Sequence, residues 1–114
     1  MSLKRGYKIK FDLHHTCTDR TNIIFDNVDI NTSDLSIYVY VGCKPMDITD
    51  IKGTLYVVNP KDKRMKIEVE NKGDYFYIIL PSEFTEEIGT YRAELSLVQG
   101  KKRIILNEFR YKVV

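Results

Sequence analysis

Histidine and cysteine are the residues of this sequence best suited to metal binding or nucleophilic chemistry. The stretch FDLHHTC holds His14, His15 and Cys17, and Cys43 follows much later. On a strand, His14 and His15 would point to opposite faces and could not bind one ion together. His15, Cys17 and Cys43 have no spacing typical of a structural zinc site. We expect no metal site and no cofactor, with a metal- or thiol-dependent enzyme on these three residues as an alternative. Two cysteines are too few for a disulfide-dense secreted domain, so we also expect free thiols.

Carboxylates are the next candidates for catalysis. Asp47 and Asp50 flank Thr49 in a polar connection, and Glu86 and Glu87 precede a glycine. General acid–base chemistry needs two carboxylates that face one cleft in different environments. Carboxylates in turns are usually solvated, and the sequence has no phosphate-binding glycine loop or other common catalytic motif. We expect that the protein is not an enzyme.

The charge pattern bears on partners. Basic residues cluster at 61–66 and 101–103, but the net charge is only +2. Such a small charge does not indicate binding to nucleic acid or to an anionic membrane, and no apolar run is long enough to span a bilayer. Both clusters fall at predicted hairpin tips, where solvated side chains are the simpler interpretation. We expect neither a nucleic-acid partner nor a membrane partner.

Tyrosine is unusually frequent, with 8 in 114 residues. Tyr38, Tyr40, Tyr75 and Tyr77 occupy the polar parity of their predicted strands, and Tyr56 has the same parity beside Leu55 and Val57. If these strands are neighbours, a stripe of tyrosine lies outside the core. Tyrosine on an outer sheet face can reflect strand propensity and cross-strand pairing alone, or a partner interface. Both explanations stay open, and these five tyrosines are the candidate interface residues.

The elements that must position these residues are strands. Apolar residues alternate with polar ones in LSIYVYV, DYFYIIL and YRAELSL, and β-branched and aromatic residues dominate these runs. NPKDKR (59–64) and NKGD (71–74) read as turns. The expected strands are 7–13, 22–30, 35–42, 51–58, 64–70, 75–80, 90–98 and 103–113. We predict one all-β domain over residues 1–114, an immunoglobulin-like antiparallel β-sandwich of about seven to eight strands, with residues 1–6 flexible.

The segment EEIGTYRA (86–93) predicts a structural corner. In immunoglobulin-like sandwiches a tyrosine begins the strand after the crossover between sheets, and its hydroxyl bonds to backbone upstream. Glu87, Gly89 and Tyr91 match this pattern, whereas Ala93 stands where antibody domains have a cysteine, and the chain has no tryptophan. The simpler alternative is a hairpin glycine followed by a core tyrosine.

Taken together, the chain resembles the N-terminal domain of the phage baseplate upper protein family. The resemblance rests on KPMDITDIKGTLYVVNPKDKR (44–64) followed by YFYIILPSEFTEEIGTYRAEL (75–95), with FDNVDINTSDLSIYVYV fitting the opening strands. The order and spacing of these elements carry it, since no single motif is specific. It covers residues 7 to 113.

This resemblance implies a non-catalytic virion structural protein of the tail baseplate, from a phage or prophage of a Gram-positive-type host, made in the bacterial cytoplasm. It implies a docking domain that attaches receptor-binding parts to the tail-tip hub. The partners would be other tail and baseplate proteins, and a homo-oligomer in the assembled baseplate is allowed. The chain ends at Val114, so we expect either a fragment or a short stand-alone relative. The alternative function is a generic immunoglobulin-like module of a bacterial protein that binds protein or carbohydrate.

Overall fold

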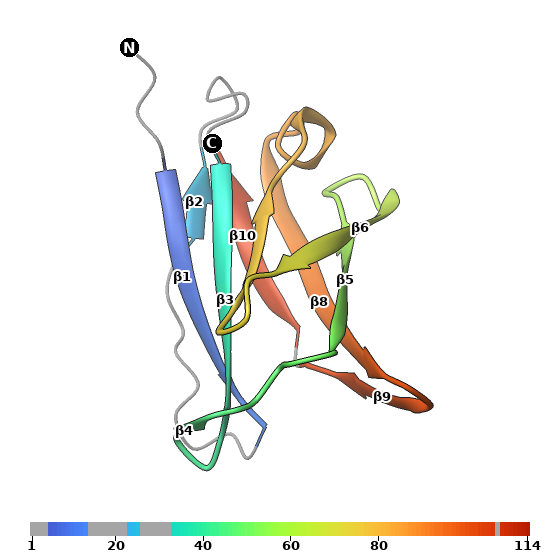
Figure 1. Ribbon diagram of the computed structural model, residues 1–114. Coiled ribbons are helices and arrows are strands. Elements are labelled where there is room, and N and C mark those ends of the chain that lie inside the picture. Colours follow the sequence, from blue (N-terminus) through green and yellow to red (C-terminus); the bar gives the residue numbers. More distant parts are fainter. Residues whose placement is uncertain (1–4, 14–22, 26–32, 107) are drawn as a thin grey trace.

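The computed structural model describes residues 5–13, 23–25, 33–106 and 108–114, and these residues form ten strands and one short 3-10 turn (Figure 1). The elements are β1 (Arg5–Asp12), β2 (Ile23–Phe25), β3 (Ser33–Val41), β4 (Lys44–Pro45), β5 (Lys52–Val58), β6 (Arg64–Asn71), β7 (Phe76–Ile79), η1 (Ser82–Phe84), β8 (Gly89–Gln99), β9 (Lys102–Ile105) and β10 (Phe109–Val113).

The strands form two sheets that share one strand. Following the hydrogen bonds, the order is β1-β3-β7-β6-β5-β8-β10-β2, with β4 added to β3 and β9 added to β8. We call β1, β3, β4 and β7 the first sheet, and β2, β5, β8, β9 and β10 the second sheet. Strand β6 joins them: residues 64–69 pair with β5, whereas Glu70 and Asn71 pair with Tyr77 and Phe76 of β7. The fold is therefore a sandwich whose two sheets are continuous along one side.

On the opposite side of the sandwich, a side chain connects the edge strands of the two sheets, β1 and β2. Strands β1 and β2 lie at the two ends of the strand order and run side by side in Figure 1. The Tyr7 hydroxyl of β1 donates a hydrogen bond of 2.7 Å to the Ile24 carbonyl of β2. The Tyr7 ring also meets the Phe25 ring edge-on, with centroids 5.3 Å apart. Tyr7 thus links strands that have no backbone pairing with each other among the described residues.

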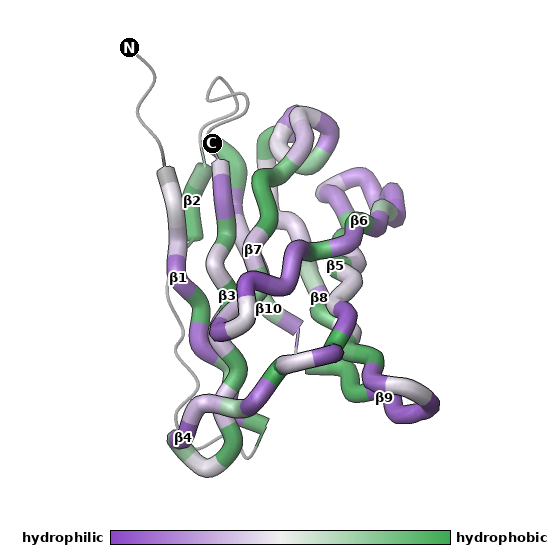
Figure 2. The backbone as a smooth tube through the Cα atoms, in the orientation of Figure 1, coloured by the Kyte–Doolittle hydropathy of each residue, from purple (hydrophilic) through white to green (hydrophobic). Residues whose placement is uncertain are grey.

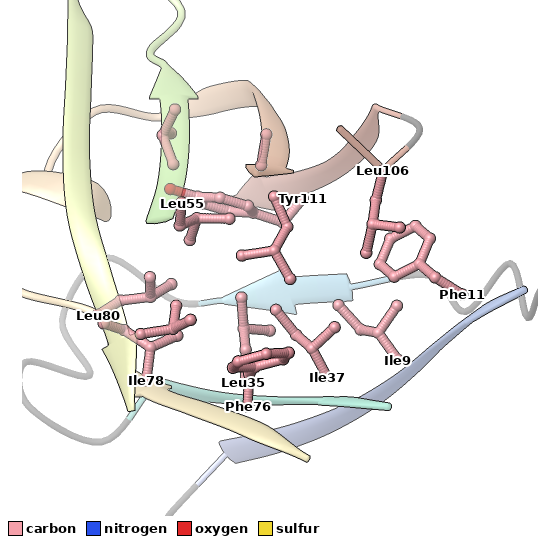
Figure 3. Packing of buried hydrophobic residues seen from close by; sticks show 14 of the residues in the cluster. Ile9, Phe11, Leu35, Ile37, Leu55, Phe76, Ile78, Leu80, Leu106 and Tyr111 are labelled. Carbon is pink, nitrogen blue, oxygen red and sulfur yellow. The ribbon is translucent and has the colours of Figure 1, made fainter. Parts of the chain in front are cut away.

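The core lies between the two sheets and follows the alternation of the sequence. In β3 the buried positions are Leu35, Ile37 and Val39, and the intervening residues are partly exposed. Figure 3 shows Ile9, Leu35, Ile37 and Phe76 on one side of the core, and Leu55 and Tyr111 on the other. Each fully buried apolar side chain contributes about 1.5–3 kcal/mol. In Figure 2 hydrophilic residues are frequent in the turns, such as those between β5 and β6 and between β8 and β9.

Two tight turns, one before and one after β6, are shaped by asparagine and glycine residues. Asn59 is buried, and its side-chain oxygen accepts hydrogen bonds from the N–H groups of Lys61 (2.9 Å) and Lys63 (2.8 Å), which shapes the β5–β6 turn. In the turn after β6, Gly73 has φ +96°, a region that favours glycine. The Asn71 amide there donates to two carbonyls of the 48–51 turn. Both predicted turns, 59–64 and 71–74, therefore lie where the sequence indicated.

The turn between β3 and β4 contains Cys43, for which a free thiol was predicted. Gly42 (φ 57°) and Cys43 (φ 67°) both have positive φ, as a two-residue type I′ hairpin requires. Their N–H groups donate to the buried Asp12 carboxylate, at 3.0 and 2.7 Å. Cys43 is exposed and disulfide-bonded, so the prediction of a free thiol at this position is wrong. The other cysteine, Cys17, lies outside the described residues.

The all-β sandwich is confirmed, with differences of detail. The described residues contain ten strands, whereas eight were predicted. One additional strand is β4, which has only two residues and was not predicted. The other arises because the predicted strand 103–113 is divided into β9 and β10. Two of the pairings, β1 with β3 and β10 with β2, are parallel, whereas the prediction was antiparallel throughout. The flexible segment predicted at 1–6 falls mostly outside the described residues, and β1 already begins at Arg5.

Candidate interaction face

The outer face of the first sheet brings most of the predicted interface tyrosines together. Tyr38 and Tyr40 alternate with buried residues along β3 and point away from the core. Tyr77 lies on the neighbouring strand β7, opposite Ser36, and Tyr75 directly precedes that strand. All four tyrosines are partly exposed. The register of β1 with β3 places Lys10 beside Tyr38 on the other flank.

Contacts among these side chains hold the rings in place. The rings of Tyr38 and Tyr75 stack with centroids 5.0 Å apart and an interplanar angle of 23°. The Lys10 ammonium lies 5.7 Å from the centroid of the Tyr40 ring, and the Lys72 ammonium lies 5.8 Å from that of Tyr77. Cation–π and stacking contacts of this kind are worth about 0.5–1.5 kcal/mol. The face is therefore partly ordered before any partner binds.

Tyr77 is held further by a carboxylate. Its hydroxyl donates a hydrogen bond of 2.7 Å to Oδ2 of Asp34 on β3. This hydrogen bond, followed by burial and by the negative charge of Asp34, raises the pKa of Tyr77 to about 12. Strand β1 contributes Gly6 beside Asp34, and any Cβ at Gly6 would collide with the Asp34 carboxylate. The glycine makes room for the acceptor that orients Tyr77.

Tyr56 does not belong to this group. It lies on β5 in the second sheet, between Lys66 of β6 and Glu94 of β8 in the register, and it is 40% exposed. The structure thus assembles four of the five predicted tyrosines on one face and places the fifth on the other sheet. Parity alone could not separate them, because it does not say which strands are neighbours.

A hollow lies at the β4 end of the tyrosine face. Its volume is about 520 Å³, and its lining includes Tyr38, Tyr40, Asp47 and Asp74. Asp47 accepts a hydrogen bond of 2.9 Å from the N–H of Thr49. Hydrogen bonds from the backbone and the side chain of Thr49 lower the pKa of the Asp47 carboxyl. Aromatic rings and a carboxylate that stays ionised therefore share one concave surface.

The three residues of the predicted corner lie together at the start of β8. Tyr91 is fully buried, and its hydroxyl accepts a hydrogen bond of 2.9 Å from the N–H of Glu87. Burial raises the pKa of Tyr91. Gly89 has φ +138°, and a Cβ there would lie 2.8 Å from Cγ of Pro60 in the β5–β6 turn. The Glu87 carboxylate reaches Lys61 of the same turn at 3.3 Å.

A second tyrosine, Tyr111, lies at this corner and was not among the predicted corner residues. Tyr111 of β10 stacks on Tyr91, with centroids 4.7 Å apart and an interplanar angle of 12°. Its hydroxyl donates a buried hydrogen bond of 2.7 Å to the Phe84 carbonyl of η1. Burial strongly raises the pKa of Tyr111. The two tyrosines bind opposite ends of the η1–β8 connection. The period-two alternation in FRYKV, which was not used, is the signal that could have identified Tyr111 as buried.

Most of the residues considered for metal and thiol chemistry cannot be placed. His14, His15 and Cys17 lie outside the part of the chain that the structure describes. Within that part, no group of three or more histidine, cysteine, aspartate or glutamate residues is placed to hold a metal ion.

The arrangement defines a class of protein: a small all-β sandwich with an ordered aromatic outer face. Comparison with known families is consistent with this class. Residues 5–114 match the family model of the BppU N-terminal domain, where BppU is the baseplate upper protein. The chain belongs to this family, which confirms the resemblance inferred from its sequence. It is accordingly a structural domain of the phage tail baseplate, part of the virion tail, and it interacts with other tail proteins.

Solved structures show the same fold at low sequence identity. The N-terminal domain of phage TP901-1 ORF48 superposes with a TM-score of 0.72 at 13% identity, over 95% of this chain and 97% of that chain. Among curated proteins, none matches the chain. Within the described residues, no helix is long and apolar enough to cross a membrane.

Proposed function

We propose that this domain is a non-catalytic docking domain that attaches the receptor-binding parts of the baseplate to the tail-tip hub. Its partner surface is the outer face of the first sheet, with Tyr38, Tyr40, Tyr75 and Tyr77 as contact residues. The observation that supports this proposal best is the prior ordering of these rings by stacking, by cations and by the Asp34 carboxylate. Ordered side chains lose less conformational entropy on binding.

The chemistry of the face also suits a protein partner. Tyrosine presents a large, fairly rigid contact area with a polar tip, and it is enriched at interface hot spots. The face offers hydroxyls as well as the ammonium groups of Lys10 and Lys72, so a partner can make both apolar and polar contacts. Nothing in this function needs a cofactor or a catalytic group.

The test is binding to the hub protein encoded in the same phage genome, measured by titration calorimetry. Truncating Tyr38 and Tyr40 together to serine should weaken binding at least tenfold, which corresponds to about 1.4 kcal/mol. Lys112→Ser is the control, because Lys112 is exposed on β10 of the other sheet and lines neither of the two hollows of the described residues. Thermal melts establish that each variant is folded.

Two results would count against the proposal. Unchanged hub binding by a folded Tyr38→Ser, Tyr40→Ser variant would remove the first sheet as the docking face. A loss of binding on Lys112→Ser alone would move the interface to the second sheet.

A second candidate function is carbohydrate binding, and the hollow beside β4 favours it. Tyr38, Tyr40, Asp47 and Asp74 line one concave surface, which is the combination that sugar recognition uses: rings for stacking and carboxylates for hydroxyl groups. However, Tyr75 already covers one face of the Tyr38 ring, and Lys10 lies over that of Tyr40. Titration with cell-wall sugars tests this function, and a saturable response lost in Asp47→Asn would support it over docking alone.

A further inference from the structure

The outer face of the second sheet carries a hollow that the proposed docking face does not use. Its volume is about 560 Å³, and strands β5, β6, β8 and β9 supply its walls. Tyr56 and Val58 of β5, Met65 of β6 and Ile105 of β9 give it an apolar part. Ile105 is 57% exposed and Tyr56 is 40% exposed. A partner that covered their apolar surface would gain binding free energy from removing it from water.

The basic residues that line this hollow are all arginines. Arg64, Arg92 and Arg103 line it, which is half of the six arginines in the sequence, and the carboxylates of Asp62, Glu94 and Glu108 line it as well. None of the eleven lysines among the described residues does so, although the sequence has twice as many lysines as arginines. Arginine presents a planar fork of donors that matches a carboxylate, whereas lysine is a flexible point charge. Tyrosine, methionine and arginine together are also the residues that protein interfaces enrich.

Two of these guanidinium groups have no carboxylate within 4.0 Å among the described residues. Arg92 reaches Asp62 at 3.7 Å, but both side chains are largely exposed, so this pair contributes little and can exchange. Glu108 is occupied by Arg110 at 3.5 Å. Neither Arg64 nor Arg103 forms an ion pair with any described residue, and Glu94 in the lining does not approach either of them within bonding distance.

Arg103 is nevertheless fixed in position. Its Nε donates a hydrogen bond of 3.0 Å to the hydroxyl of Ser96. Ser96 is only 3% exposed, and it lies opposite Ile105 in the register of β8 with β9. The bond uses the inner nitrogen of the guanidinium and leaves both terminal nitrogens for another acceptor. Because this hydrogen bond already restricts the guanidinium group, an anion that binds there costs less conformational entropy.

We propose that this hollow is a second docking site, which takes an acidic, extended segment of another baseplate protein. Carboxylates of the segment bind the guanidinium groups of Arg64 and Arg103, and an apolar side chain between them covers Val58, Met65 and Ile105. The site is independent of the tyrosine face, since it lies on the other sheet and shares no lining residue with the hollow beside β4. A domain with two such faces can contact two neighbours at once.

The test uses a capped five-residue peptide with two aspartates on either side of one leucine, and nitrogen-15 NMR of the protein. The Nε–H signals of Arg64 and Arg103 should shift and saturate at millimolar peptide. A peptide with asparagine in place of all four aspartates should bind at least tenfold more weakly. Arg64→Lys and Arg103→Lys, which keep the charge and remove the fork, should each weaken binding at least fivefold. Arg110→Lys is the matched control outside the hollow, and its affinity should equal that of the unchanged protein.

Four outcomes would overturn the proposal. They are the absence of a saturable shift, equal binding of the asparagine peptide, and shifts that map to the tyrosine face instead. The fourth is a concentration-dependent dimer, seen by ultracentrifugation and lost in Arg103→Glu, which would make a second copy of the chain the occupant. Failure of the hub experiment with Tyr38 and Tyr40 leaves this result unaffected, because the variants and the probe differ.

Discussion

Removing the hydroxyl of Tyr91 tests the predicted corner most directly. In Tyr91→Phe the ring and its stacking on Tyr111 remain, and only the acceptor for the Glu87 N–H is lost. A hydrogen bond contributes about 0.5–1.5 kcal/mol net, and a donor left partly buried without a partner adds to the loss. Because Glu87 is only partly buried, water can replace some of the bond. We expect a loss of about 1–2 kcal/mol in the free energy of unfolding.

This loss is large enough to measure in a domain of this size. The entropy of unfolding is about 2.1 cal/mol/K per residue, so about 1–2 kcal/mol lowers the melting temperature of 114 residues by about 4–8 °C. Urea unfolding should give the same free-energy change with an unchanged m-value. Hydrogen exchange adds a local readout, since the Glu87 amide should exchange much faster in the variant.

The matched control is Tyr38→Phe, which removes the hydroxyl of a partly exposed tyrosine whose ring stacks on Tyr75. Its unfolding free energy should change by less than about 0.5 kcal/mol. If Tyr91→Phe melts at the temperature of the unchanged protein and the Glu87 amide stays protected, the hydrogen bond is not a structural corner. The simpler interpretation, a core tyrosine after a hairpin glycine, would then replace it.

Three further predictions concern other parts of the fold. Gly89→Ala should lower the unfolding free energy by about 2 kcal/mol or more in urea, because φ +138° is strained for alanine and its Cβ would lie 2.8 Å from Pro60; an unchanged midpoint would contradict this. The raised pKa of Tyr77 stabilises the fold below pH 10, and this stabilisation should disappear as the pH rises from 10 to about 12. The unfolding free energy of Tyr77→Phe should lack this part of the pH dependence. Asp34→Asn should lower the pKa of Tyr77, measured by ultraviolet titration. Reduction of the disulfide at Cys43 should destabilise the protein by about 2–4 kcal/mol, and identical melts with and without reductant would refute it.

The sequence predicted the elements and the core well because both depend on local patterns. Period-two alternation placed Leu35, Ile37 and Val39 in the core, and the structure buries all three. The turn at Asn59 was recognisable because asparagine and proline have specific turn chemistry. The outward position of Tyr38 and Tyr40 also follows from parity.

Strand neighbours and side-chain partners could not be predicted in this way. Parity says nothing about which strand lies beside which, so Tyr56 was grouped with tyrosines of the other sheet. The parallel pairing of β1 with β3 joins residues far apart in the chain, and no local signal marks it. The basic clusters were interpreted as solvated tips, whereas Arg64 and Arg103 line one hollow because β6 and β9 flank the same outer face. Cys43 was misjudged because a single pair of cysteines gives no spacing pattern.

The two sheets are joined differently on the two sides of the sandwich, by the backbone of β6 on one side and by the Tyr7 side chain on the other. Along β6 a continuous backbone passes from one sheet to the other, so separating the sheets there would break ladder hydrogen bonds. Between β1 and β2, by contrast, a side-chain bond from Tyr7 spans the two edges. Among the contacts of the described residues, a force that separates the two sheets would therefore meet less resistance between β1 and β2 than along β6.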